Sequence, residues 1–244
     1  MKICLSCTIP TVRMDAREVH RQATSWISLL LPAHEEFQNW WVVPDGPKDP
    51  FVPLGDAETV ISSIQSSDRA FYREFPDAES DGSTGVLLTN AGSEKQWRER
   101  GKVFLSIKPT LGRVTLEISR LEEIYASPGA LVWSLLKGLS SDARVTFANT
   151  NVMQNVAGEL LLYSYSRAVY KHREFLGWMG YVDSPILPGQ LPDSAILESQ
   201  RGGTLILATE LLDLADPRMV EQVNRVEMSL AELGLLPVID PTAM

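Results

Sequence analysis

Few residues of this sequence have the type and spacing that redox or metal chemistry requires. Cys4 and Cys7 form a Cys-x-x-Cys pair, which is typical of a redox site or of half a metal site. Positions three apart in a strand point to opposite faces, however, and the sequence holds no second cysteine pair. His20, His34 and His172 are scattered and show no paired-ligand spacing. We therefore predict reduced thiols, no metal site and no cofactor.

Motifs of hydrolases and nucleotide-binding proteins are also missing from the sequence. There is no Gly-x-Ser-x-Gly elbow, and Gly101-Lys102 lacks the upstream glycine and the following Ser or Thr of a phosphate loop. Pro44-Asp45 and Pro76-Asp77 resemble the first half of a metal-dependent nuclease motif. No lysine has the acidic residue two positions before it that the second half needs. We therefore predict no catalytic residues and a protein that is not an enzyme.

Composition places the chain among globular proteins and limits the classes of molecule that it can bind. The 244 residues are 44% hydrophobic and 22% charged, which are ordinary values. The net charge of −9 argues against direct nucleic-acid binding and suits a basic protein partner. Apolar stretches such as 26–31 are too short to span a bilayer. Residues 1–7 leave no room for the apolar region of a signal peptide, so we expect a cytoplasmic protein without membrane contact.

The elements that position these side chains follow from caps and apolar periodicity. A helix is predicted from Asp15, which forms a capping-box pattern with Glu18, to Pro32. A second helix begins after Asp56, and 149–173 fits either a helix or a strand. Strands are predicted over 2–9, 40–43, 85–89, 103–107, 114–118, 144–148 and 177–182, with a third helix from 127–128.

The strongest pattern lies near the C-terminus. The run 204–209 is apolar on both faces, which predicts a strand buried on both sides. A helix follows between the N-cap Asp216 and Gly234, which can adopt the left-handed conformation after a helix end. Its predicted apolar stripe consists of Met219, Val223, Val226, Leu230 and Leu233. This strand and helix should form the centre of the fold.

No repeat or low-complexity linker divides the chain. We therefore predict a single α+β domain over 1–244, with helices packed on a mostly antiparallel sheet. A polar and acidic excursion is expected around 76–101, and a monomer is favoured.

An acidic stretch and a pair of tryptophans are the candidates for an interaction surface. The acidic stretch could steer a basic partner toward the protein, although a solvated loop would have the same composition. Adjacent residues in a strand face opposite ways, so one of Trp40 and Trp41 can be exposed, or both can be buried. The predicted partner-binding residues are Glu74, Asp77, Glu79, Asp81 and Trp40.

The order of landmarks along the chain resembles the immunity-protein-52 family of bacterial polymorphic-toxin systems. The strongest part of the resemblance is Arg201-Gly202-Gly203-Thr204-Leu205-Ile206 through Asp216-Pro217, Val223-Asn224 and Leu235-Leu236-Pro237. The other matching features are Leu29-Leu30-Leu31, Trp40-Trp41, Phe51-Val52-Pro53, Tyr165-Ser166-Arg167-Ala168-Val169-Tyr170 and Gly177-Trp178-Met179-Gly180-Tyr181. The resemblance covers nearly the whole chain, and 80–101 fits it poorly.

The resemblance implies a non-enzymatic antidote. Family members are encoded beside toxins with a restriction-endonuclease-like fold, some of them delivered by type VI secretion. The implied partner is a cognate nuclease effector toxin, which the protein would neutralise in the cytoplasm of producer and kin cells. Because such a protein must discriminate between toxins, its contacts are expected in variable loops such as the acidic one. Plugging of the active site and binding elsewhere on the toxin both fit.

Two other functions are compatible with the residues. One is a small hydrolase or transferase with a dispersed site around Glu159, Tyr163 and His172. The other is an adaptor subunit with no inhibitory role. A deep pocket that gathers ionisable groups would favour the enzyme, and a large apolar patch without acidic surroundings would favour the adaptor.

Overall fold

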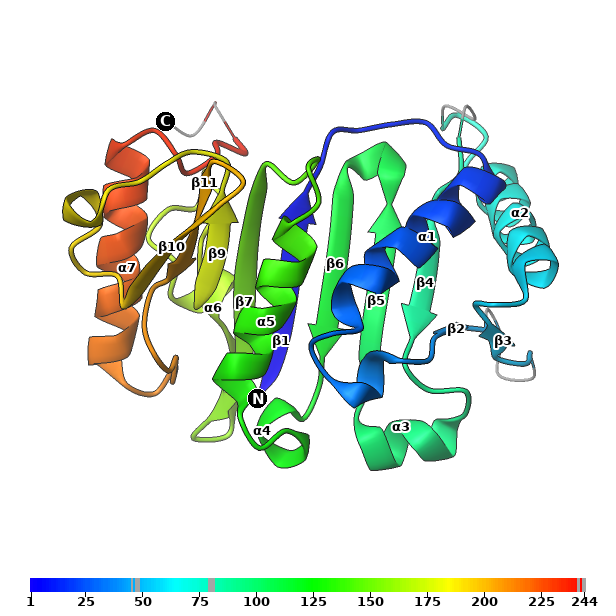
Figure 1. Cartoon of the computed structure of the whole chain (residues 1–244), viewed down its shortest axis with the longest axis horizontal. Helices are drawn as coiled ribbons and strands as arrows, with labels where there is room; N and C mark the ends of the chain where they lie inside the picture. Colours follow the sequence, from blue (N-terminus) through cyan, green and yellow to red (C-terminus); the bar gives the residue numbers. More distant parts are fainter. Residues whose placement is uncertain (45, 47–48, 79–81, 241, 243–244) are drawn as a thin grey trace. The chain divides into compact units, whose positions relative to one another are not determined.

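Helices packed against antiparallel strands make up the protein, as a computed structural model shows (Figure 1). The structure describes residues 1–244 except 45, 47–48, 79–81, 241 and 243–244. The chain divides into unit 1, Met1–Cys7 with Leu121–Met244, and unit 2, Thr8–Arg120. The predicted α+β class with a mostly antiparallel sheet is confirmed.

Unit 2 contains a sheet and the first helices of the chain. Its strands run in the order β6 (Arg113–Ile118), β5 (Val103–Lys108), β4 (Val86–Thr89), β2 (Trp41–Val42) and β3 (Val52–Pro53). Its helices are α1 (Ala16–Leu30), α2 (Ala57–Glu74) and α3 (Glu94–Arg100), with 3-10 turns η1 (Glu35–Phe37) and η2 (Pro109–Leu111). Neighbouring strands of this unit pair antiparallel throughout.

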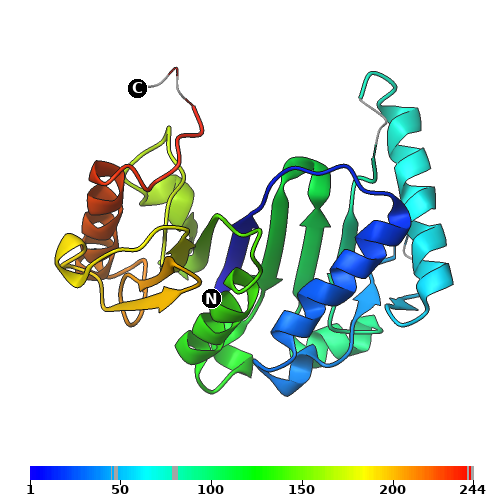
Figure 2. The ribbon, with the colours of Figure 1, turned by 45° about the horizontal axis from the view of Figure 1, so that its top comes forward.

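Helix α1 forms where its caps predict. The Asp15 carboxylate accepts from the Glu18 amide at 2.8 Å, and the Glu18 carboxylate accepts from the Asp15 amide at 3.0 Å. The helix lies over β4, β5 and β6, and its apolar stripe, centred on Trp26, is buried (Figures 1 and 2). On the side of β5 and β6 toward the core every second residue is fully buried, as the alternation predicts.

Helix α2 departs from its prediction in its second half. The apolar spacing of Val60, Ile61, Ile64, Phe71 and Phe75 predicts one buried face. Val60 and Ile64 are buried, but Phe71 is 39% and Phe75 is 49% exposed. The reason lies in Asp68, whose carboxylate accepts from the amide and the hydroxyl of Thr84, both at 2.8 Å. Polar bonds rather than apolar packing therefore hold this part of the helix.

Unit 1 contains the other strands of the chain. They run in the order β10 (Ile196–Gln200), β11 (Gly203–Leu207), β9 (Met179–Val182), β7 (Phe147–Val156) and β1 (Lys2–Thr8), and β8 (Glu159–Leu162) pairs with β7. Its helices are α4 (Leu121–Ile124), α5 (Pro128–Ser140), α6 (Tyr163–Ser166) and α7 (Pro217–Glu232), with the 3-10 turn η3 (Pro188–Gln190). Every residue of β11 is buried, which confirms the prediction for this strand.

The caps of α7 also agree with the sequence, but its stripe differs at both ends. Gly234 has a φ of +72°, and the Leu235 amide donates to the Leu230 carbonyl at 2.8 Å. The buried residues of α7 are Val220, Val223, Val226, Glu227 and Leu230. Val220 thus takes the place predicted for Met219, and Leu233 is 37% exposed.

Glu227 is an acidic residue inside this apolar stripe. Its side chain is fully buried and accepts from the amides of Leu176 at 2.9 Å and Gly177 at 3.1 Å. A third amide, that of Val169, lies 3.5 Å away. Burial raises the pKa of this carboxyl above its ordinary value. Glu227 therefore ties the segment that precedes β9 to helix α7.

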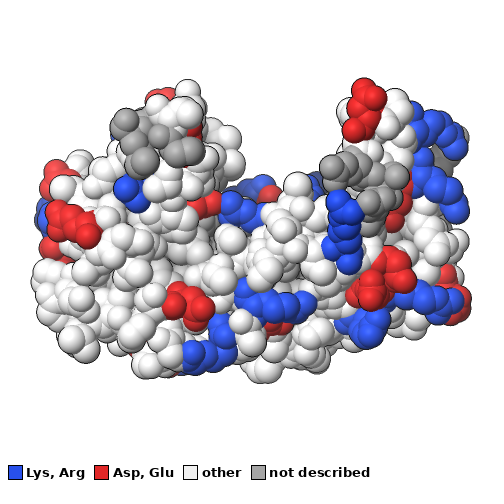
Figure 3. Space-filling view, turned by 90° about the horizontal axis from the view of Figure 1, so that it is seen from above, with Lys and Arg blue, Asp and Glu red and all other residues white. Residues whose placement is uncertain are grey.

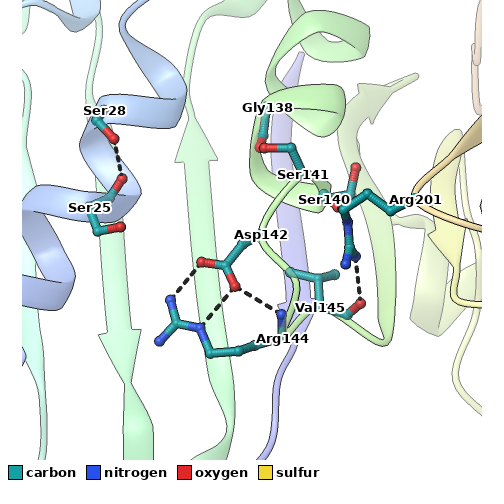
Figure 4. Close-up of polar contacts among 9 residues, drawn as sticks. All are labelled: Ser25, Ser28, Gly138, Ser140, Ser141, Asp142, Arg144, Val145 and Arg201. Carbon is teal, nitrogen blue, oxygen red and sulfur yellow. Dashed lines mark hydrogen bonds and ion pairs between the residues drawn. The ribbon is translucent and has the colours of Figure 1, made fainter.

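The turn between β10 and β11 is held by Arg201, which has a φ of +50° (Figure 4). Its guanidinium donates to the carbonyls of Ser140 at 2.9 Å and Val145 at 3.2 Å. Beside it, Arg144 and Asp142 form a two-pronged ion pair with N–O distances of 2.6 and 2.9 Å. The Arg201 landmark of the sequence is thus a structural anchor between α5 and the sheet.

Candidate interaction site

One face of the sheet in unit 2 is less buried than the other. We call it the open face and define it by Trp41, Leu87, Phe104, Ser106 and Thr115. The strand register aligns these side chains in two cross-strand rows, because Trp41 pairs with Thr89 and Thr89 with Phe104, while Leu87 pairs with Ser106 and Ser106 with Thr115. Leu87 is 41% exposed, whereas its chain neighbour Leu88 on the opposite face is fully buried.

Aromatic rings cover one end of the open face. Trp97 of α3 donates its indole N–H to the Thr89 hydroxyl at 2.7 Å, and its ring lies 5.5 Å from that of Phe104. Phe51 approaches Trp97 edge-on at 5.1 Å. The Lys102 ammonium lies 5.1 Å from the centre of the Trp97 ring. These aromatic side chains are half-exposed, so they form a rigid, partly hydrated surface rather than core.

A groove lies where α2 runs beside β4. We call it the α2 groove; it has a volume of about 640 Å³. Most of its wall is apolar, with exposed fractions of 39% for Phe71, 41% for Leu87 and 64% for Leu111. Its polar lining includes the hydroxyls of Ser63, Ser67, Thr84, Ser106 and Thr110, and the ammonium of Lys108. The size and lining suit a short segment of another molecule.

The acidic candidates lie at the end of α2. Glu74 is its last residue and Asp77 follows three positions later; both are exposed, and Ala78 lines the α2 groove. Glu79 and Asp81 lie outside the described residues. Acidic and basic side chains are interspersed over this side of unit 2, at the right in Figure 3. Two of the four predicted carboxylates are therefore exposed near the end of α2, and neither of them lines the α2 groove.

Trp40, predicted as a partner-binding residue, lies in the core and not at the surface. Its side chain is only 5% exposed, its indole donates to the Phe37 carbonyl at 2.8 Å, and its ring stacks on Phe37. Strand β2 begins at Trp41, so Trp41 rather than Trp40 belongs to the open face, where its ring covers Gly92. The two adjacent tryptophans do face opposite ways, but the alternation of a strand does not by itself decide which of them points outward.

The residues considered for an enzyme do not form a shared site. Tyr163 is fully buried and donates to the Asn224 side chain at 3.0 Å. Glu159 is exposed at the start of β8, and His172 is half-buried with its ring 5.8 Å from that of Tyr170. Cys4 is half-buried and Cys7 is buried, as expected for opposite strand faces, and neither cysteine forms a disulfide. Among the described residues, no three His, Cys, Asp or Glu side chains cluster as metal ligands.

Comparisons with known proteins give little further information. No family model matches the chain, and no curated protein matches it. One solved structure to which it is similar is described as the Pseudomonas aeruginosa "T6SS protein PA0821". The match covers 93% of this chain and 72% of that chain, with 10% sequence identity and a TM-score of 0.47. A likeness of this degree assigns no function. In the part of the chain that the structure describes, no helix is long and apolar enough to cross a membrane.

Proposed function

We propose that the protein is an immunity protein that binds a cognate nuclease toxin and neutralises it without chemistry of its own. The observation that carries the proposal is the surface of unit 2, where the open face and the α2 groove expose aromatic and apolar side chains, and where Glu74 and Asp77 are exposed at the end of α2. The resemblance of the sequence to the immunity-protein-52 family supplies the class of partner.

The composition of this surface suits protein recognition. Interfaces are enriched in tryptophan, phenylalanine and tyrosine, and a few buried aromatic anchors contribute most of the binding free energy. Trp41, Trp97 and Phe104 are already held in place by their neighbours, so little side-chain entropy is lost on binding. The α2 groove beside them can accept an apolar side chain or short segment of the toxin.

Charge supports a nuclease as the partner. A nuclease must present a basic surface to phosphates, and this chain carries a net charge of −9. Exposed Glu74 and Asp77 would accelerate association with such a surface through electrostatic steering. Since a few free toxin molecules are harmful, we expect a dissociation constant on the order of nanomolar or lower.

The decisive experiment is co-expression with the toxin encoded beside this gene, followed by pull-down and a nuclease assay. A stable complex and loss of nucleic-acid cleavage at equimolar protein are expected. If the toxin neither binds nor is inhibited, the proposal is wrong.

A charge-reversal series locates the contact. Replacing Asp77, Glu79 and Asp81 with lysine should slow association about tenfold at low salt and leave dissociation nearly unchanged. The matched control reverses three exposed carboxylates of unit 1, Glu159, Glu221 and Glu232, and changes the net charge by the same amount. Equal effects of the two sets would show that net charge alone acts, and would remove the acidic segment from the interface.

A further inference from the structure

A second cavity in unit 2 differs in character from the α2 groove and shares only Tyr72 with it. We call it the arginine cavity; its volume is about 760 Å³. Its charged lining consists of Arg13, Asp15, Asp68, Arg69 and Arg73. Three arginines from two segments of the chain thus surround one hollow of an otherwise acidic protein.

The α2 wall of this cavity is a polar helical stripe. Positions 65, 68, 69, 72 and 73 follow the spacing of a helix face that normally packs into a core. Here the stripe carries no aliphatic residue, so it faces the cavity and solvent instead. The opposite wall is fixed, because the Ser83 amide donates to the Met14 carbonyl at 2.7 Å and the Tyr72 hydroxyl donates to the Gly82 carbonyl. The cavity is therefore a built feature of the fold.

Two of the arginines carry a charge that no carboxylate of the described residues neutralises in an ion pair. Arg69 and Arg73 are exposed one helical turn apart, and like charges at this spacing destabilise a helix. Neither forms an ion pair within the described residues. Arg13 interacts with other groups of the fold, so Arg69 and Arg73 are the arginines whose charge is available to a ligand.

The two carboxylates that line the cavity bond to other groups and form no ion pair with Arg69 or Arg73 within the described residues. Asp15 caps α1 by accepting from the Glu18 amide, and Asp68 accepts two hydrogen bonds from Thr84. The two exposed guanidinium groups therefore keep their N–H donors for an external acceptor. Guanidinium groups bind paired oxygen atoms of carboxylates and phosphates in two-pronged geometry.

We propose that the arginine cavity binds paired carboxylates of a partner protein, an arrangement of oxygen atoms that pyrophosphate can imitate as a probe. Provided that the proposed function holds, the natural source is the toxin. A metal-dependent nuclease holds Mg²⁺ with clustered carboxylates inside a basic surface. Arg69 and Arg73, flanked by Glu74 and Asp77, present the complementary arrangement of a basic centre beside acidic residues.

Calorimetric titration with pyrophosphate tests the cavity without any toxin. The wild-type protein should bind pyrophosphate, and the R69Q/R73Q variant should lose about tenfold in affinity for each arginine removed. R69K/R73K keeps the charge but not the planar fork, so its affinity should be intermediate. The matched control, K95Q/R98Q, removes two exposed cations from α3 and should bind pyrophosphate like the wild type. No binding by the wild type, or equal losses in both double-glutamine variants, would overturn the proposal.

A competition experiment then identifies the source of the oxyanion. If toxin carboxylates occupy the cavity, excess pyrophosphate should weaken toxin binding by the wild type but not by R69Q/R73Q. Toxin binding that is insensitive to pyrophosphate would overturn the assignment of toxin carboxylates to the cavity. If the wild type binds no toxin at all, the proposed function is wrong, while the pyrophosphate titration still decides the cavity.

Discussion

Unit 1 and unit 2 use their polar side chains in opposite ways. Unit 1 buries Glu227 completely and directs it at backbone amides, and its Arg201 spans from one turn to two carbonyls of another segment. Unit 2 keeps Arg69, Arg73, Glu74 and Asp77 at the surface, and leaves an apolar face partly uncovered. The strongest sequence pattern, the buried strand and the capped helix over 204–234, lies in unit 1, and the candidate contacts lie in unit 2. The difference suggests a scaffold whose polar groups fix the fold and a recognition region whose polar groups remain available.

Removal of the Glu227 carboxylate should cause the largest loss of stability. Glu227→Ala leaves the buried amides of Leu176 and Gly177 without an acceptor, and each such loss costs about 1–3 kcal/mol. We expect a loss of about 3–4 kcal/mol in the free energy of unfolding, measured by urea denaturation. Val223→Ala in the same stripe removes only apolar packing and is the matched control. A loss below that of the control would contradict the anchoring role.

The same residue predicts a pH dependence. Because burial raises the pKa of Glu227 above the ordinary 4.5, the folded protein binds a proton that the unfolded chain releases. Its protonation therefore stabilises the fold most at low pH, and this contribution is lost as pH rises from 4.5 through the folded-state pKa. Glu227→Gln cannot titrate, so the stability difference between the variant and the wild type should shift in favour of the variant over this range. A difference that does not change with pH would contradict the raised pKa.

Arg201→Ala should rank next in stability. The variant leaves the Ser140 and Val145 carbonyls without this donor and removes the cation from above the Tyr181 ring, 5.5 Å away. We expect a loss of about 2 kcal/mol, measured as the shift in urea midpoint at constant slope. Arg201→Lys keeps the charge but not the fork, so it should recover less than half of this loss. Full recovery by lysine would mean that charge alone acts at this turn.

Local signals were readable from the sequence because they act over a few residues. Asp15 with Glu18, Asp216 and Gly234 cap their helices as predicted, since each cap depends only on residues within one turn. The buried strand β11 also followed from its own composition. The short helix α3 was missed, although Ser93 accepts from the Gln96 amide in a typical N-cap.

Features that depend on residues far apart in the sequence could not be predicted from the sequence. Glu227 is tolerated in an apolar stripe because its carboxylate accepts hydrogen bonds from amides that lie 50 and 51 residues away in the sequence. The residues next to Glu227 in the sequence give no sign of these partners. The burial of Trp40 depends on its stacking against Phe37 and on the start of β2 at the next residue. The exposure of Phe71 depends on the hydrogen bond between Asp68 and Thr84. Of the candidate site, composition predicted the acidic segment, while the open face and both cavities required strand register and helix placement.

The α2 groove should behave in the opposite way to unit 1, because substitutions there should change binding more than stability. Leu87→Ser and Leu111→Ser replace side chains that are 41% and 64% exposed, so each should change stability by less than about 0.5 kcal/mol. If the α2 groove contacts the toxin, either substitution should weaken toxin binding about tenfold, mainly through faster dissociation. Leu160→Ser, at a residue of unit 1 that is also 64% exposed, is the matched control and should leave binding unchanged. Weaker binding in the control as well would spread the contact beyond unit 2.

The smallest effect is expected at Asp142, where a charged pair of unit 1 remains partly hydrated. Burial would raise the pKa of Asp142, but hydrogen bonds from Arg144 and the charge of Arg201 outweigh it and hold the pKa below 3.8. The ionised carboxylate therefore stabilises the fold above pH 3.8, and this contribution is lost as pH falls through the lowered pKa. Asp142→Asn should cost less than about 1 kcal/mol at neutral pH, because the paired Arg144 side chain is 38% exposed. The difference from the wild type should shrink in acid denaturation series below pH 3.8. A cost that equals that of Arg201→Ala would mean that the charged pair, rather than the Arg201 bonds to backbone, anchors this end of unit 1.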